Sequence, residues 1–190
     1  MIIAFIIAAF VIAADQISKY IVKTNMNIGQ SFNLIPNILN IRYIENEGAS
    51  FGILKDHRWI FMSLSSVALA GMCVIIIYLS RRSVRKNNFY VNVALSFMFG
   101  GGIGNMIDRL FNESVYNSSI EKGKKVVVDF LEFDFIDFAV FNFADAFICI
   151  GSVLLCVCIF AGKYRLHNVT HDAIMPEPPQ QENETENIYD

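Results

Sequence analysis

The sequence has little charge for its length, and this is what first restricts its class. Only 17% of its 190 residues are Asp, Glu, Lys or Arg, whereas 54% are hydrophobic and the mean hydropathy is +0.44. A soluble globular domain usually carries about 25% charged residues. The composition therefore excludes an ordinary soluble domain and indicates a membrane protein.

Histidine is scarce as well, and the cysteines are not spaced as a disulfide framework. The three histidines, at positions 57, 167 and 171, are not grouped as zinc ligands, and the sequence has no H-E-x-x-H motif. A zinc hydrolase is therefore disfavoured, and we expect neither a metal nor another cofactor. The four cysteines lie inside long apolar runs, where a free cysteine behaves as a small hydrophobic residue and not as part of a disulfide framework.

Four apolar runs are each long enough to cross the membrane, since a hydrocarbon core of about 30 Å takes roughly 20 helical residues. They occupy residues 2–22, 59–79, 90–110 and 140–162. The first has no basic segment before it and stays apolar beyond Asp15, so we expect a retained helix and not a cleaved signal peptide. We predict an α-helical membrane domain over residues 1–166 and a disordered acidic tail over 167–190.

The loop between the second and third runs carries four basic residues, Arg81, Arg82, Arg85 and Lys86. Dense basic loops stay in the cytoplasm, so we predict cytoplasmic termini. The end of the first run, the end of the third and the start of the fourth then lie at the outer face. The longer outer loops also contain basic residues, but their charges are mixed and the rule is weaker there.

With that topology the polar residues inside the runs gather at one depth, near the outer face. These residues are Asp15, Lys19, Asn105, Asp108, Arg109, Asn142 and Asp145. Ionisable groups at such a depth usually face the bundle interior, and residues three or four apart share one helix face. Lys19 and Arg109 also fit a simpler role, in which they reach toward the lipid headgroups, and Asp15 with Lys19 fits a simple neutralising pair. Asp145 fits such explanations least, because no basic residue lies within one helical turn of it.

The two long outer connections differ in pattern. Residues 30–54 contain an alternation of apolar and polar residues around positions 39–43, which predicts a short sheet at the membrane interface. Residues 111–139 fit neither a helical nor a strand period and interleave phenylalanines with acids, which predicts an interfacial segment. Asp129 lies in this second connection, where Glu132, Asp134 and Asp137 make it one of several acids that water could solvate.

Two glycine motifs suggest functions that their surroundings contradict. Residues 48–52 read G-A-S-F-G and match G-x-S-x-G, but a nucleophile elbow needs a strand-to-helix turn with an acid and then a histidine downstream. Residues 100–104 read G-G-G-I-G, but they interrupt an apolar run with no strand before it. Small residues in such a run let transmembrane helices approach closely, and we predict that role here.

Five short sequence motifs follow one another along the chain. They read D-Q-I-S-K at 15–19, N-E-G-A-S-F at 46–51, G-G-I-G-N-M-I-D-R-L at 101–110, V-V-D-F at 127–130 and F-N-F-A-D at 141–145. Together they resemble the lipoprotein signal peptidase family, also called signal peptidase II. The likeness covers the chain except the tail. It departs at Ser50, where alanine is common, and at residues 112–125, a stretch longer than usual.

This resemblance implies an aspartic endopeptidase of the bacterial inner membrane, with Asp129 and Asp145 as its catalytic pair. It implies supporting or substrate-binding roles for Asp15, Lys19, Asn46, Gly48, Asn105, Asp108, Arg109 and Asn142. The implied substrate is a prolipoprotein cut on the amino side of a cysteine that carries diacylglycerol. We expect membrane lipid as a further partner, no nucleic acid, and a monomer.

Two other classes stay open from the residues alone. A small proton-coupled transporter could use the intramembrane Asp, Lys and Arg residues as a relay, although the chain shows no internal repeat of the kind such folds commonly have. A membrane scaffold could associate through the glycine-rich third run, but it leaves the clustered charges unexplained.

Overall fold

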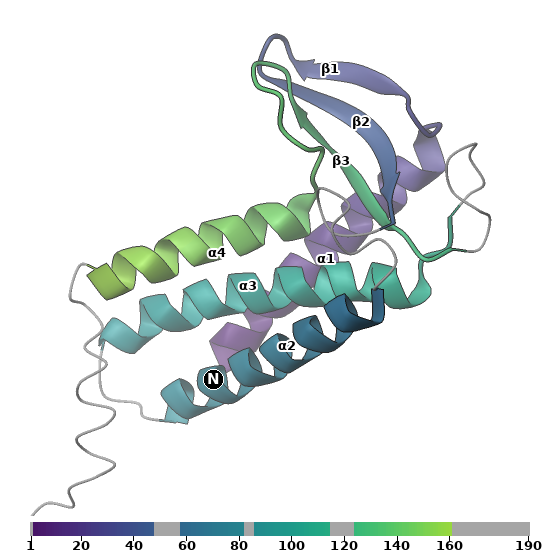
Figure 1. Ribbon diagram of the computed structural model, residues 1–190. Coiled ribbons are helices and arrows are strands. Elements are labelled where there is room, and N and C mark those ends of the chain that lie inside the picture. The colour runs from purple at the N-terminus through teal and green to yellow at the C-terminus, as the bar shows by residue number, and fades with distance from the viewer. Residues whose placement is uncertain (1, 48–57, 82–85, 115–123, 161–190) are drawn as a thin grey trace, which may run out of the picture.

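A computed structural model describes residues 2–47, 58–81, 86–114 and 124–160 of the chain. Within them, four long helices form a bundle that carries a small antiparallel sheet at one end (Figure 1). The elements are α1 (Ile2–Asn25), β1 (Ser31–Ile35), β2 (Leu39–Asn46), α2 (Arg58–Arg81), α3 (Lys86–Phe111), β3 (Val127–Phe133) and α4 (Phe143–Phe160). The predicted fold class, a four-helix membrane protein with a small sheet, is confirmed.

All four helices are long and apolar enough to cross a membrane, and α3 lies at the centre of the bundle, in contact with α1, α2 and α4. The glycine run of α3 makes this packing possible. A Cβ atom added at Gly101 would lie 2.4 Å from the carbonyl oxygen of Ala144 in α4, and one at Gly104 would lie 2.5 Å from the Asp15 carboxylate in α1. The glycines therefore let three helices meet at the depth of the polar residues, as the sequence predicted.

The fourth helix begins at Phe143, three residues later than its apolar run. Phe141 forms an isolated antiparallel bridge with Leu131 of β3, so the chain before the helix is still extended. Asn142 follows directly and caps the helix, and this cap fixes where α4 begins.

The sheet has the strand order β1-β2-β3, and both pairs are antiparallel. Strands β1 and β2 fall in the connection where the sequence predicted a sheet. Strand β3 falls in residues 111–139, where no strand was predicted, and the reason lies in its burial. Residues 127–131 are all buried, so the strand lacks the alternation that a half-exposed strand shows.

The sheet is fixed to the bundle by its own small core. Val22 near the end of α1 packs with Tyr43 of β2 and with Val128, Phe130 and Leu131 of β3. The side of β2 and β3 that carries Tyr43, Val128 and Phe130 is thereby held against the end of α1. Asn46 and Asp129 lie on the opposite side of the two strands, where they contribute to a site.

Candidate active site

Asp145 is part of the cap that begins α4. The Asn142 side-chain oxygen accepts a hydrogen bond from the Asp145 backbone N–H at 3.0 Å, and the Asn142 backbone N–H donates to the Asp145 carboxylate at 3.2 Å. This reciprocal pair is a capping box, which satisfies donors that a helix start leaves unpaired. The backbone N–H of Ala144, the next such donor, bonds to Asp15 of α1 at 3.0 Å.

Asp129 reaches the same place from β3. It is 2% exposed, and each of its carboxylate oxygens accepts a hydrogen bond from a side-chain amide. Asn46 of β2 donates to one oxygen at 2.9 Å, and Asn142 donates to the other at 2.7 Å. Asn142 therefore contacts both acidic residues, since it also caps the helix turn that holds Asp145.

Asn105 of α3 completes this link. Its side-chain nitrogen donates to Asp145 at 2.8 Å, and its oxygen accepts from Asn142 at 3.0 Å and from Lys19 at 2.9 Å. Because the oxygen has two donors and the nitrogen has an acceptor, the orientation of the amide is fixed by its neighbours. The two carboxylates are thus connected through two asparagine side chains.

Lys19 supports the centre from behind. It is 4% exposed, and its ammonium group lies 2.8 Å from Asp15 and 2.9 Å from Asp108, in addition to its bond with Asn105. Three acceptors match the three N–H donors of an ammonium group, so the buried charge is fully paired. Lys19 therefore does not reach out to the headgroups, and its pair with Asp15 is one part of a larger network.

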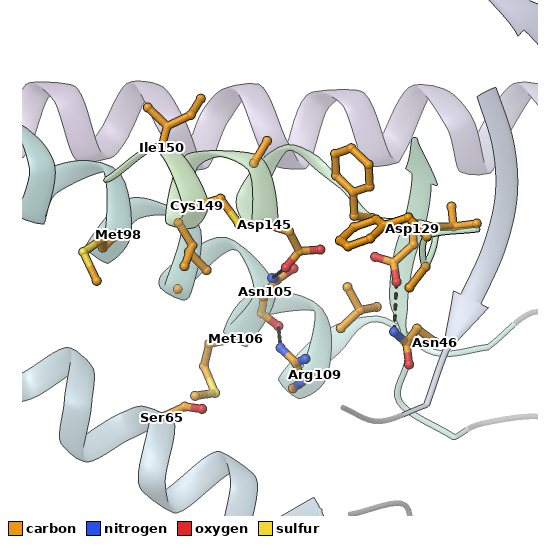
Figure 2. A pocket seen from close by; sticks show the side chains of 18 of the residues that line it. Asn46, Ser65, Met98, Asn105, Met106, Arg109, Asp129, Asp145, Cys149 and Ile150 are labelled. Atoms are coloured by element: carbon orange, nitrogen blue, oxygen red, sulfur yellow. Dashed lines mark hydrogen bonds between the residues drawn. The ribbon is translucent and has the colours of Figure 1, made fainter. Parts of the chain in front are cut away.

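A cavity of about 1120 Å³ opens beside the two carboxylates. Its polar wall contains Asp129, Asp145, Asn46, Asn105 and Arg109, and the rest is mostly apolar side chains from α2, α3, α4 and the segment before α4. Figure 2 shows the carboxylates of Asp129 and Asp145 pointing toward one another across it. The cavity thus joins a pair of acids to an apolar groove between membrane helices.

The electrostatics of Asp129 fit a shared proton. Burial is the main reason that the pKa of Asp129 rises to about 7, and the neighbouring charge of Asp145 raises it further, while the hydrogen bonds from Asn46 and Asn142 oppose the rise. A carboxyl group with this pKa holds its proton for part of the time near neutral pH. Two close carboxylates with one proton between them are able to act as acid and base together.

The structure brings nearly all the predicted site residues together. Nine of the ten lie in this network or on the cavity wall, namely Asp15, Lys19, Asn46, Asn105, Asp108, Arg109, Asp129, Asn142 and Asp145. The tenth, Gly48, lies outside the described residues. Asp129 is buried, so it is not one of several solvated acids, whereas Asp134 is bonded to Asn40 farther along the sheet.

Sequence reasoning missed two supporting contacts. Gln16 donates to Asp15, to Asp108 and to the carbonyl of Gly104 at 3.1–3.2 Å, and its only signal was its place beside Asp15 in a polar block. Buried Glu45 accepts from Tyr43 at 3.0 Å and from Ser114 at 2.5 Å, which ties β2 to the segment after α3. Nothing in the sequence distinguished Glu45 from a solvated acid.

Within residues 2–47, 58–81, 86–114 and 124–160, no three His, Cys, Asp or Glu side chains are placed to hold a metal ion. The chemistry that these residues offer at the site is that of carboxylates, amides and cationic side chains.

Comparisons with known proteins agree on one family. Residues 7–161 match the family described as Signal peptidase (SPase) II. A lipoprotein signal peptidase from Brevibacillus brevis is 36% identical over 156 residues, which cover 82% of this chain and 93% of that protein. One from Streptococcus pyogenes serotype M6 is 34% identical over 149 residues, which cover 78% and 87%.

Two solved structures of bacterial membrane enzymes resemble this fold. A bacterial membrane enzyme solved by the in meso method at 2.3 Å resolution superimposes with a TM-score of 0.65 at 30% identity, covering 94% of this chain and 96% of that one. A second, solved at 1.9 Å, gives a TM-score of 0.61 at 33% identity, covering 84% and 93%.

Proposed function

The chain belongs to the signal peptidase II family and is a membrane peptidase, and from this premise we propose that it is an aspartic endopeptidase. Its proposed substrates are diacylglyceryl-modified prolipoproteins, from which it removes the signal peptide on the amino side of the lipidated cysteine. The observation that carries this proposal is the convergence of Asp129 and Asp145 on one cavity wall, linked through Asn142 and Asn105.

The proposed reaction uses one proton shared by the two carboxyl groups. The ionised member takes a proton from a water molecule, which attacks the scissile carbonyl carbon. The protonated member donates a hydrogen bond to the carbonyl oxygen, and a proton then passes to the leaving amine as the C–N bond breaks. The two members titrate as a pair, so the roles belong to the pair and not to a fixed residue.

The site supports positioning of a substrate as well as the chemistry. The Asn105, Asn142 and Asn46 amides hold the two carboxylates from three different elements, so their geometry is fixed before substrate binds. Arg109 lies on the cavity wall and also donates to the Asn105 carbonyl at 3.2 Å. We propose that it binds polar groups of the substrate next to the scissile bond.

The shape of the cavity supports a lipid-anchored substrate. Its apolar wall includes Leu69 and Met72 of α2, Met98 and Met106 of α3, and Ile148 of α4, all from helices long enough to span the membrane. An acyl chain would bury its apolar surface there. The lipid would then hold the adjacent peptide bond at the level of the two aspartates.

We also propose the orientation that the basic loop between α2 and α3 predicts, with cytoplasmic termini and the site near the outer face. Two of its basic residues, Arg82 and Arg85, lie outside the described residues. The lipid attachment of the substrate fits this placement, since a lipidated cysteine lies at the boundary between membrane and water.

Purified protein incubated with a lipid-modified preprolipoprotein tests the proposal. We expect cleavage by the native protein, and loss of cleavage without loss of folding in both Asp129→Asn and Asp145→Asn. Asp134→Asn is the matched control, because Asp134 belongs to the same connection but bonds to Asn40, and it should stay active. An active Asp145→Asn protein would refute the catalytic pair, and equal cleavage of unmodified substrate would refute the lipid requirement.

A further inference from the structure

The free end of the sheet exposes large apolar side chains from two separate segments. Each of the six is between 46% and 62% exposed. They are Leu34, Ile35 and Ile38 around the β1–β2 turn, and Phe135, Ile136 and Phe138 between β3 and α4. We call these six residues the sheet tip. A cluster of this kind is unusual on a surface that faces water and marks a contact site.

The two segments of the sheet tip are joined to each other. The Asp134 backbone N–H donates to the Ile38 carbonyl at 3.0 Å, and Leu39 is paired with Phe133 where β2 meets β3. The Phe133 ring packs against the rings of Phe135 and Phe138, with ring centres 5.5 and 6.0 Å apart. The sheet tip is therefore one connected unit.

The depth of this unit follows from α4. That helix has 18 residues, which span about 27 Å, close to the roughly 30 Å of a hydrocarbon core. In the proposed orientation, Phe143, its first residue, therefore lies at the outer hydrocarbon boundary. Phe141, two residues earlier, is bridged to Leu131 of β3, and its ring packs against Phe133 at 5.1 Å. The chain leaves the membrane directly into the sheet tip.

Figure 1 shows where the sheet tip lies relative to the helices. The β1–β2 turn does not extend beyond the ends of α1 and α3, but bends back until it is level with the start of α4. The backbone of the sheet tip is therefore level with the start of α4 and to the side of the bundle.

The charges of the two segments give anionic headgroups nothing to bind. Residues 31–41 and 131–141 contain no Lys or Arg, and the charges that they do carry are all acidic. Asp134 accepts a hydrogen bond from Asn40 at 3.0 Å, and Asp137 lies on the cavity wall. Anionic headgroups would thus gain nothing from this surface, whereas the hydrocarbon boundary would bury its apolar side chains.

We propose that the sheet tip is a second membrane anchor, inserted into the outer edge of the lipid bilayer beside the start of α4. Its occupant is the bilayer itself, with which α4 is already in contact. The strand that carries Asp129 is then held by the membrane at both the tip and the start of α4. This inference concerns lipid contact alone and holds whatever reaction the site performs.

Tryptophan fluorescence tests the proposal, because Trp59 is the only tryptophan in the chain. In a Trp59→Phe background, Ile38→Trp and Phe135→Trp each place one fluorophore in the sheet tip. Phe32→Trp is the matched control on β1. Phe32 pairs with Ile41, which lies three residues and so about 10 Å from Ile38 along the strand direction. The proteins are reconstituted in vesicles of phosphatidylcholine brominated at defined acyl positions.

We expect brominated lipid to quench the Ile38→Trp and Phe135→Trp variants as strongly as it quenches native Trp59 at the start of α2, and more strongly than the Phe32→Trp control. Added anionic lipid should not change this order. The proposal is overturned if either tip variant is quenched only by aqueous acrylamide, or no more by brominated lipid than the control. Leu34→Trp replaces a tip variant that does not fold. No substrate is used, so the outcome is independent of peptidase activity.

Discussion

The hydrogen bond from Asn46 to Asp129 leads to a prediction about the pH dependence of activity. The proposed pair is active while it holds one proton, so activity should fall as the pH rises through the pKa of Asp129, about 7. The Asn46 amide stabilises the charged form of Asp129 and so lowers its pKa. In an Asn46→Ala variant, Asp129 should therefore keep its proton to higher pH. The alkaline limb of the pH–activity profile should then move to higher pH.

The size of this shift follows from the geometry. A hydrogen bond to a charged group is worth about 1.5–3 kcal/mol, and about 1.4 kcal/mol corresponds to one pKa unit. The bond is 2.9 Å long, but Asn46 is only partly buried, so water replaces some of its effect. We expect the low end of this range, a shift of about one pH unit.

The assay is kcat/KM for a lipid-modified preprolipoprotein, measured across the titration range of the pair, because this parameter reports ionisations of the free enzyme. Asn40→Ala is the matched control. Asn40 is also an asparagine of β2 with its amide bonded to a carboxylate, but that carboxylate is Asp134. Its alkaline limb should stay where the native limb lies.

A loss of rate in Asn46→Ala does not test the effect of Asn46 on the pKa of Asp129, because Asn46 also lines the cavity. The direction in which the alkaline limb shifts tests this effect. If the alkaline limb of Asn46→Ala stays in place or moves to lower pH, Asp129 is not the group whose deprotonation ends activity. An equal upward shift in Asn40→Ala would show that the effect is general to the sheet and not carried by the Asn46 bond.

Three further predictions concern stability. Asp129→Asn should be more heat-stable than the native protein, because the pKa of Asp129 is near 7 in the folded protein and lower in the unfolded chain. The native protein therefore loses stability as the pH rises from about 4 to 7, and over this range the difference in free energy of unfolding should grow to a few kcal/mol. Gly104→Ala should lower the melting temperature strongly, since its Cβ would lie 2.5 Å from a carboxylate oxygen, whereas Gly71→Ala has no atom within 4 Å and should be neutral or stabilising. Ser114→Ala should cost about 1–3 kcal/mol by removing a donor from a buried carboxylate, and Ser66→Ala, whose hydroxyl is exposed, should change the melting temperature little. Equal melting temperatures within either matched pair, or no pH-dependent margin for Asp129→Asn, would contradict the corresponding argument.

The sequence predicted the parts of this structure that depend on length and composition. A run of about 20 apolar residues has few alternatives to a membrane helix, so all four helices were found. The glycine run likewise indicated a close helix contact, which Gly101 makes with α4. The exact start of α4 was not readable, because it depends on the reciprocal bonds of Asn142 and Asp145 and on the bridge at Phe141.

What the sequence did not show are the contacts made by folding. Strand β3 is buried on both faces, so its residues lack the alternation that identifies a strand. The resemblance of short blocks named Asp129, but only the pairing of β3 with β2 explains how it reaches Asn46. The contact of Glu45 with Ser114 joins residues 69 positions apart, and no local pattern encodes it.

The spacing of Asp15 and Lys19 has a consequence for how the protein is made. When α1 enters the membrane during synthesis, α3 and α4 do not yet exist, and an isolated lysine would resist insertion. Its counter-ion is already one turn away on the same helix, 2.8 Å from it in the finished protein. Asp108 and Asn105 join Lys19 when α3 arrives, and Asp15 then receives the Ala144 N–H when α4 inserts last. The order in which the ribosome delivers the helices is thus the order in which this polar network is completed.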